Sequence, residues 1–237
     1  MRIRSDILAL YGIADLHLDS TGQKPMDIFG DNWIKHQEKI FNNWKNIISD
    51  DDVVLIAGDI SWALRLSEAY IDLKKIDELP GHKVISRGNH DYWWSTKSKL
   101  EALNLKTIHF LHNDSYIYNS IVICGTRGWP PKDSDEFDPH DEKIFAREVN
   151  RLDLSLSHIK DNELQKIVMI HYPPFNIENK KPNEFVDVMK KYNVRKCVYG
   201  HLHGEGHKYA VEGNIGEIDF HCISSDYINF IPKKIID

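Results

Sequence analysis

Short apolar runs rich in β-branched residues recur along this chain, and five of them end directly at side chains that bind metals or exchange protons. No polar alternation exposes one face of these runs, which is typical of strands buried on both faces of a sheet. The runs are Ile7 to Ala14, Val53 to Ala57, Lys83 to Ser86, Lys166 to Ile170 and Cys197 to Tyr199. Ligands of open α/β sheets bind beyond the carboxyl ends of the strands. We therefore expect the polar side chains that follow the runs to meet at one edge.

The residues that follow the five runs include aspartate, histidine and asparagine in short clusters. In chain order they are Asp15-Leu16-His17, Gly58-Asp59, Arg87-Gly88-Asn89-His90-Asp91, His171, and Gly200-His201-Leu202-His203. A single Asp-x-His arises easily by chance, and Asp138-Pro139-His140 and Asp219-Phe220-His221 match it without following a run, so we expect neither to be a ligand. Gly-Asn-His-Asp is far rarer, with about 0.005 occurrences expected from composition.

Between the early runs, apolar residues recur at the spacing of a helix. One apolar helical face would be formed by Trp33, Ile40, Trp44, Ile47 and Ile48. Ser61 is placed to cap a second helix that ends before Pro80-Gly81. Later, two runs around Asn119-Ser120 predict a hairpin, and Lys208 to Tyr227 predicts further short strands. The sequence therefore predicts an α/β fold with mixed sheets, in a single domain over residues 1–237.

Composition narrows the possible classes of protein. The 237 residues carry 30 Lys+Arg against 36 Asp+Glu, for a net charge of −6, which argues against general nucleic-acid binding. Three cysteines imply no disulfide framework and favour a reducing, cytoplasmic location. Ile7 to Ala14 is too short to span a bilayer, so we expect no membrane association. The sequence does not determine the oligomeric state.

The complete set of motifs, in order from Asp15 to His203, resembles the calcineurin-like metallophosphoesterases. The resemblance implies a four-layer α-β-β-α sandwich with two mixed sheets and a dinuclear metal site at the strand-end loops. It also implies the ligands: one metal would be bound by Asp15, His17 and His203, the other by Asn89, His171 and His201, with Asp59 bridging them.

The chemistry of these donors agrees with that implication. Imidazole and carboxylate ligands without cysteine suit divalent Mn, Fe, Zn or Co, and two such ions can lower the pKa of a bridging water. We therefore expect a phosphohydrolase that cleaves a phosphate ester by attack of a metal-bridging hydroxide. The resemblance makes His90 the general acid, with Asp91 accepting its other ring N–H and raising its pKa.

Three further features lie near these motifs. Arg127, in a glycine-containing segment after a buried run, could clamp a phosphate, or it could pair with the acidic run Asp133 to Asp141. Tyr92, Trp93 and Trp94 could stack on a base or sugar, although packing in the core explains them equally well. The polar segment Lys132 to Glu142 is a candidate lid.

The substrate stays open at this point. Both phosphate monoesters and diesters fit, and the diester alternative includes cyclic nucleotides and nucleic-acid ends. The acidic composition favours a small or soluble phosphate ester. An alternative of another class is a non-catalytic metal-binding scaffold for protein interactions, but the complete set of motif residues, including His90, argues against it.

Overall fold

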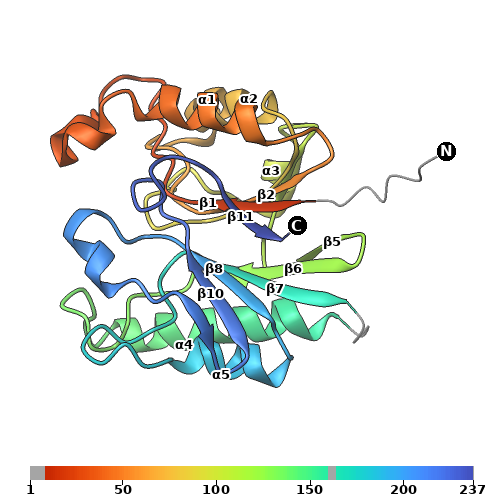
Figure 1. Cartoon of the computed structure of the whole chain (residues 1–237), viewed down its shortest axis with the longest axis vertical. Coiled ribbons are helices and arrows are strands. Elements are labelled where there is room, and N and C mark those ends of the chain that lie inside the picture. The colour runs from red at the N-terminus through yellow and green to blue at the C-terminus, as the bar shows by residue number, and fades with distance from the viewer. Residues whose placement is uncertain (1–8, 160–163, 237) are drawn as a thin grey trace.

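The computed structural model describes residues 9–159 and 164–236 as two stacked sheets with helices on both outer faces (Figure 1). The first sheet contains, in spatial order, β11 (Lys233–Ile236), β1 (Leu10–Ile13), β2 (Val53–Ala57), β3 (His82–Ser86) and β4 (Ile108–Phe110). The second contains β5 (Ser115–Tyr118), β6 (Ile121–Thr126), β7 (Gln165–Ile170), β8 (Lys196–Tyr199), β10 (Ile218–Cys222) and β9 (Gly213–Ile215).

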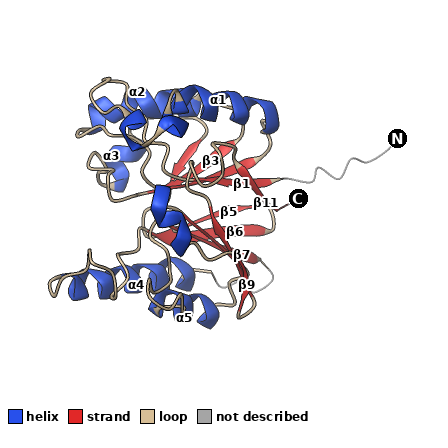
Figure 2. Cartoon of the chain, turned by 60° about the vertical axis from the view of Figure 1, so that its left-hand side comes forward, coloured by secondary structure: helices blue, strands red, loops and turns tan. Residues whose placement is uncertain are grey.

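The helices form the two outer layers of the sandwich (Figure 2). The first sheet is covered by α1 (His36–Ile47) and α2 (Leu66–Asp77), with the short α3 (Lys97–Glu101) nearby. The second is covered by α4 (Asp141–Ser157) and α5 (Glu184–Lys191). This confirms the four-layer α-β-β-α architecture expected from the sequence. None of the helices within the described ranges is both long enough and apolar enough to cross a membrane.

Both sheets are mixed, as expected. Strands β1 to β4 run parallel and β11 joins β1 antiparallel. Strands β6, β7, β8 and β10 also run parallel, with β5 and β9 antiparallel at the two edges. Because the inner strands are parallel, their carboxyl ends lie together, which is where the polar motifs occur.

Three apolar layers hold the sandwich together. Trp33 and Trp44 pack between the first sheet and its helices, while Phe145 and Phe185 pack between the second sheet and its helices. The layer between the sheets consists of aliphatic side chains such as those of Leu55 and Met169. Burying one such side chain stabilises a fold by roughly 1.5–3 kcal/mol. This packing provides a rigid base for the loops at the strand ends.

The structure corrects some local predictions. The strand predicted from Ile7 begins at Leu10, and Ile7 itself lies outside the described residues. Trp33 belongs to a short 3-10 helix ahead of α1. Ser61 does not cap α2, which begins at Leu66, because its hydroxyl donates to Asp72 Oδ2 at 2.7 Å. The predicted hairpin forms between β5 and β6.

Candidate metal centre

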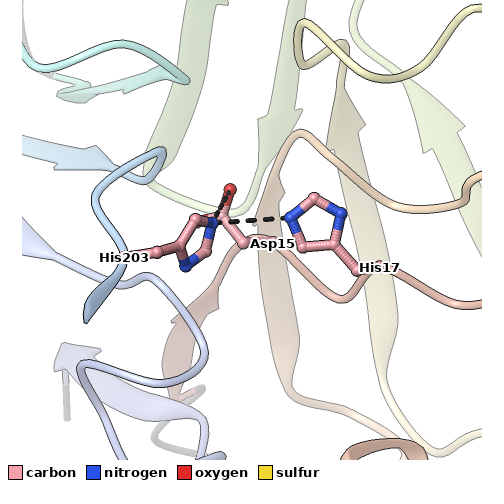
Figure 3. A group of neighbouring side chains, drawn as sticks. All are labelled: Asp15, His17 and His203. Atoms are coloured by element: carbon pink, nitrogen blue, oxygen red, sulfur yellow. Dashed lines mark hydrogen bonds and ion pairs between the residues drawn. The ribbon is translucent and has the colours of Figure 1, made fainter. Parts of the chain in front are cut away.

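The loops after β1, β2, β3, β7 and β8 bring all seven predicted metal-binding side chains to one place. Two overlapping groups have ligand atoms within 4.8 Å of one another: Asp15, His17 and His203, and Asp15, Asp59 and His171. Figure 3 shows the first group, in which both imidazoles lie beside the Asp15 carboxylate. Asp15 belongs to both groups.

Short distances link the members of the first group. His203 Nε2 lies 3.4 Å from His17 Nε2 and 3.6 Å from Asp15 Oδ1. Asp59 Oδ2 lies 3.9 Å from His17 Nε2 and 3.5 Å from His171 Nε2. The Asp59 carboxylate therefore lies between the two sets of ligands that the resemblance distinguishes.

Asn89 joins the second set of ligands. Its Oδ1 lies 2.7 Å from His171 Nε2 and 3.1 Å from His201 Nδ1. The backbone N–H of His201 donates to Asp15 Oδ2 at 2.9 Å, which ties the loop after β8 to the loop after β1. Side chains from both sheets thus converge on one point.

The two sheets are joined directly beside these ligands. Ala14, which follows β1, forms an isolated parallel bridge with Ser224, which follows β10. The Ala14 N–H donates to the Ile223 carbonyl at 2.8 Å, and the Ser225 N–H donates to the Ala14 carbonyl at 3.0 Å. The next N–H, that of Asp15, donates to Gly58 in the first sheet at 2.9 Å. Asp15 is therefore positioned by both sheets.

Outer hydrogen bonds fix two imidazoles with their Nε2 atoms toward the centre. His203 Nδ1 lies 2.8 Å from Asp226 Oδ1, and His171 Nδ1 lies 2.8 Å from the Ala57 carbonyl oxygen. Burial lowers the pKa of His171, so this ring is neutral, donates from Nδ1 and leaves Nε2 unprotonated. The pKa of His203 is raised, so its Nε2 would become a ligand only when a cation displaces the proton. At His171 the Nε2 lone pair faces the Asn89 oxygen, another acceptor, and a cation would relieve this opposition.

Unpaired polar atoms in the described chain point to the same conclusion. Asp15 Oδ1 and His17 Nδ1 have no hydrogen-bond partner there. Both atoms are buried, and the whole Asp15 residue is inaccessible to water. Buried polar atoms in folded proteins are normally paired, so an orphaned carboxylate oxygen needs an explanation. The donor set of carboxylate, imidazole and amide oxygen fits divalent transition metals.

The pKa values reflect carboxylates crowded together without a compensating cation. Burial, with the nearby Asp15 charge, raises the pKa of Asp59. Burial would lower the pKa of His203, but Asp15 and Asp226 raise it to about 10. Burial lowers the pKa of His201 to about 3. The raised pKa values of Asp59 and His203 both reflect the negative charge of the buried Asp15 carboxylate, which also favours a divalent cation.

The backbone at the centre is strained. Asp15, His17, Asp59 and His201 all have positive φ angles, of 59°, 43°, 52° and 73°. Non-glycine residues rarely adopt this region, and such strain clusters at functional sites. Gly88 is required for close approach, because a Cβ there would lie 2.1 Å from Asp59 Oδ1.

The structure corrects the expected role of Asp91. Its carboxylate does not contact the His90 ring but accepts from the backbone N–H groups of Asp59, Ile60, Ser61 and Gly88, and from the Trp93 indole. The side chain points inward beneath the loops, whereas His90 points toward His17, with ring centroids 5.8 Å apart. Asp91 therefore holds the loops after β2 and β3 together.

The expected pKa of His90 is also wrong. Burial lowers the pKa of this imidazole, and His90 Nδ1 is buried without a partner within the described ranges. In the part of the chain that the structure describes, no carboxylate accepts a hydrogen bond from the His90 ring, so the cause of the expected increase in pKa is missing. The ring instead packs against Trp62, with centroids 4.6 Å apart.

Arg127 follows neither of the two expectations in full. Its partner is not the acidic run but Glu148 of α4, at 3.7 Å, and the guanidinium stacks over Trp129 at 4.3 Å. Of the aromatic cluster, Trp93 is in the core and Trp94 packs partly against it, whereas Tyr92 is 59% exposed.

The segment Lys132 to Glu142 borders a groove of about 550 Å³ that reaches His201 and His203. Asp133 fixes the segment by accepting from the N–H groups of Ile177 and Glu178 at 2.9 and 3.0 Å. The groove is also lined by Asp135 and Glu136.

Sequence reasoning missed two residues that contact the centre. Asp226 supports His203, and Trp62 stacks on His17 with centroids 4.7 Å apart. A signal for Asp226 existed, because Ser224-Ser225-Asp226 follows β10 as the other motifs follow their strands. Trp62 carries no comparable signal.

Comparisons with known proteins agree with this geometry. The 3-D fold resembles the phosphopantetheinyl hydrolase of Mycobacterium tuberculosis (TM-score 0.60, 17% identity, covering 97% of this chain and 96% of the other). It also resembles a protein of unknown function from Aquifex aeolicus (TM-score 0.50, 15% identity, 96% and 95%). A third likeness is to an anchor of the inner membrane complex of Plasmodium (TM-score 0.51, 12% identity, 92% and 71%).

At these identities the likenesses show the fold alone. A search of curated proteins found no significant match to the sequence. Residues 9–205, which include every motif, match the family of calcineurin-like phosphoesterases. With the predicted fold present and the motifs gathered into a site suited to metals, this chain belongs to the calcineurin-like phosphoesterases and is a phosphoric ester hydrolase.

Proposed function

We propose that this protein hydrolyses a small, soluble phosphate ester with two divalent ions of Mn, Fe, Zn or Co. Asp15, His17 and His203 would hold one ion, and Asn89, His171 and His201 the other, with Asp59 between them. The observation that carries this proposal is the convergence of these donors around the unpaired Asp15 Oδ1. When bound, the ions supply Lewis acidity and lower the pKa of a water nucleophile.

His90 is the proposed general acid for the leaving oxygen. Its ring is partly buried beside His17. Nδ1 is buried without a partner in the described chain, so Nε2 is the ring nitrogen that we assign to proton exchange with a substrate atom. The His90 N–H of the backbone donates to Asp59 Oδ1 at 2.8 Å, which fixes the residue next to the carboxylate between the ligand sets. Asp91 acts as a positioning residue, because it orders the loops that carry Asp59 and His90.

The groove beside His201 supports a small substrate. Asp133, Asp135, Glu136 and Glu178 line it, and their charges would repel a polyanion such as nucleic acid. Residues 133–136 of the segment Lys132 to Glu142 line the groove, which makes this segment the proposed substrate-selecting element.

The test uses the leaving group as a probe of His90. In the manganese-loaded protein, His90→Ala should reduce kcat for phenyl phosphate, whose leaving group needs a proton, by about 10²- to 10⁴-fold. The loss for 4-nitrophenyl phosphate should be much smaller. His158→Ala, at an exposed position after α4, is the matched control.

Two further measurements separate the alternatives. Faster hydrolysis of bis(4-nitrophenyl) phosphate than of the monoester would favour a phosphodiesterase. Two bound metals without turnover of either ester would favour the non-catalytic scaffold. Less than one metal per chain after reconstitution, with no activity, would overturn the proposed function.

A further inference from the structure

Next to the metal centre is a pocket of about 90 Å³ that contains three arginines. Arg87 follows β3, Arg127 follows β6 and Arg151 lies on α4, so the three come from distant parts of the chain. A water needs roughly 10–15 Å³ of such space. The pocket therefore has room for a group of several heavy atoms.

The positive charges of the three arginines exceed the negative charge of the carboxylate that lines the pocket. Glu148 is its one lining carboxylate, and it accepts from Arg151 Nη1 and from the Thr126 hydroxyl, both at 2.5 Å. Arg127 Nη2 lies 3.7 Å from the same carboxylate. Glu148 is almost fully buried, so water screens these charges poorly. Three guanidinium groups facing one carboxylate leave a net positive pocket.

Buried donors in the pocket lack acceptors. Among the described residues, Arg87 Nε, Arg127 Nε and Ser86 Oγ are buried without a hydrogen-bond partner. Ser86 is only 2% exposed. Buried donors are normally satisfied, and leaving them unpaired is costly. An anion with several acceptor oxygens would compensate the excess positive charge, and it would satisfy these donors once the side chains turn toward it.

The position of the pocket connects it to the reaction. Arg87 is two residues before the ligand Asn89. The Arg127 carbonyl accepts from the N–H groups of His171 and Tyr172, at 3.1 and 3.2 Å. On the outer side, Asn113 is exposed at the edge of the pocket. A substrate could therefore place one end at the metal ligands and another among the arginines.

We propose that this arginine pocket binds a second phosphate group of the substrate, so that the substrate is a phosphate ester with two phosphates. The proposal rests on the proposed function, because it assumes that the first phosphate is cleaved at the metal centre. Free inorganic phosphate has the same chemistry, and the experiment below distinguishes the two sources.

The experiment compares esters that differ only in the second phosphate. The manganese-loaded full chain is assayed with alkanediol bisphosphates of increasing spacer length and with alkyl monophosphates of the same lengths. At the best spacer, kcat/KM for the bisphosphate should exceed that for the monophosphate by about tenfold or more. Arg151→Gln should bring this ratio close to one.

Matched variants exclude a general effect of lost charge or stability. Arg147→Gln removes an exposed arginine of the same helix, outside the pocket, and should keep the wild-type ratio. Asn113→Asp adds a negative charge at the pocket edge and should also lower the ratio. Asn113 has a φ of 58°, a conformation that aspartate tolerates, so this variant keeps the fold intact.

Binding provides a readout that does not depend on turnover. Propane-1,3-bisphosphonate should bind the wild type more tightly than propylphosphonate in calorimetry, and Arg151→Gln should remove the difference. An equal ratio in the wild type and both variants would overturn the pocket proposal while leaving the hydrolase intact. Inorganic phosphate binding that needs Arg151, without any preference for bisphosphates, would also overturn it. Hydrolysis of neither ester would instead count against the proposed function.

Discussion

The two ends of the first sheet both bury charged groups, but they treat them differently. At the amino ends of β3 and β4, Lys83 donates to the Gly81 carbonyl and to Thr107 Oγ1, both at 2.9 Å, and also to the Leu79 carbonyl. Asp77 accepts from the Thr107 N–H at 2.8 Å and from Lys74 at 3.0 Å. Every one of these buried charged groups has partners.

The carboxyl ends show the opposite pattern. There Asp15 Oδ1, His17 Nδ1 and His90 Nδ1 have no hydrogen-bond partner within the described residues, and four residues have strained backbone angles. Burial of charge is thus common to both ends, whereas missing partners and strain occur together at one. The difference indicates that the amino end serves stability and the carboxyl end serves ligand binding.

Asp15→Asn should have the largest effect of the substitutions that test the difference between the two ends. Asp15 is a proposed ligand of one ion, and its carboxylate also lies in the group with Asp59 and His171. Its loss should therefore remove the ion held with His17 and His203, weaken binding of the other, and reduce kcat/KM by about 10³-fold or more. Because the Asp15 carboxylate accepts from the His201 N–H and helps to raise the pKa of His203, the unfolding temperature of the metal-free protein should fall as well. Metal analysis, kinetics and calorimetry measure these three effects. Retention of two metals would contradict the assignment of Asp15.

Asp226→Asn tests the support of a single ligand. Asp226 accepts from His203 Nδ1, and loss of such an outer acceptor typically reduces metal affinity by about 10- to 100-fold. We expect one of the two metals to bind more weakly in a competition titration with a chelator. Equal weakening of both would show that the two ligand sets do not act separately.

Lys83→Met tests the amino end. The substitution leaves the carbonyls of Leu79 and Gly81 without their donor, so it should destabilise the fold by about 1–3 kcal/mol. Thermal unfolding measures the loss, and kcat should stay at the wild-type value. A fall in kcat at temperatures where the variant is fully folded would show that the two ends are coupled.

The smallest expected effect is a pH dependence at Asp77. Burial would raise the pKa of Asp77, but hydrogen bonds from Thr107 and Lys74 outweigh it and the pKa falls below its ordinary 3.8. A lowered pKa in the folded state stabilises the protein above the unfolded value, and this contribution is lost as the pH falls through the folded value. The stability difference between wild type and Asp77→Asn should therefore shrink below about pH 4. A constant difference from pH 7 to pH 3 would contradict this account.

The sequence predicted the site residues correctly where they directly follow a buried strand. Buried runs locate the strands, and parallel strands place Asp15, Asp59 and His171 at a common edge. It failed where side-chain direction matters, because adjacent residues such as His90 and Asp91 point to different surroundings. It also could not find the arginine pocket, since Arg87, Arg127 and Arg151 are brought together only by the packing of α4 on the second sheet.

The bridge between Ala14 and Ser224 has a mechanical consequence. It is a seam between the sheets, and it lies directly beside the residues that would hold the ions. Ligands from both sides of the seam, such as Asp59 from the first sheet and His171 from the second, would share the same cations. Bound metal would therefore link the two sheets and oppose movement of one sheet relative to the other. The candidate metal centre and this backbone contact between the two sheets therefore lie in the same place.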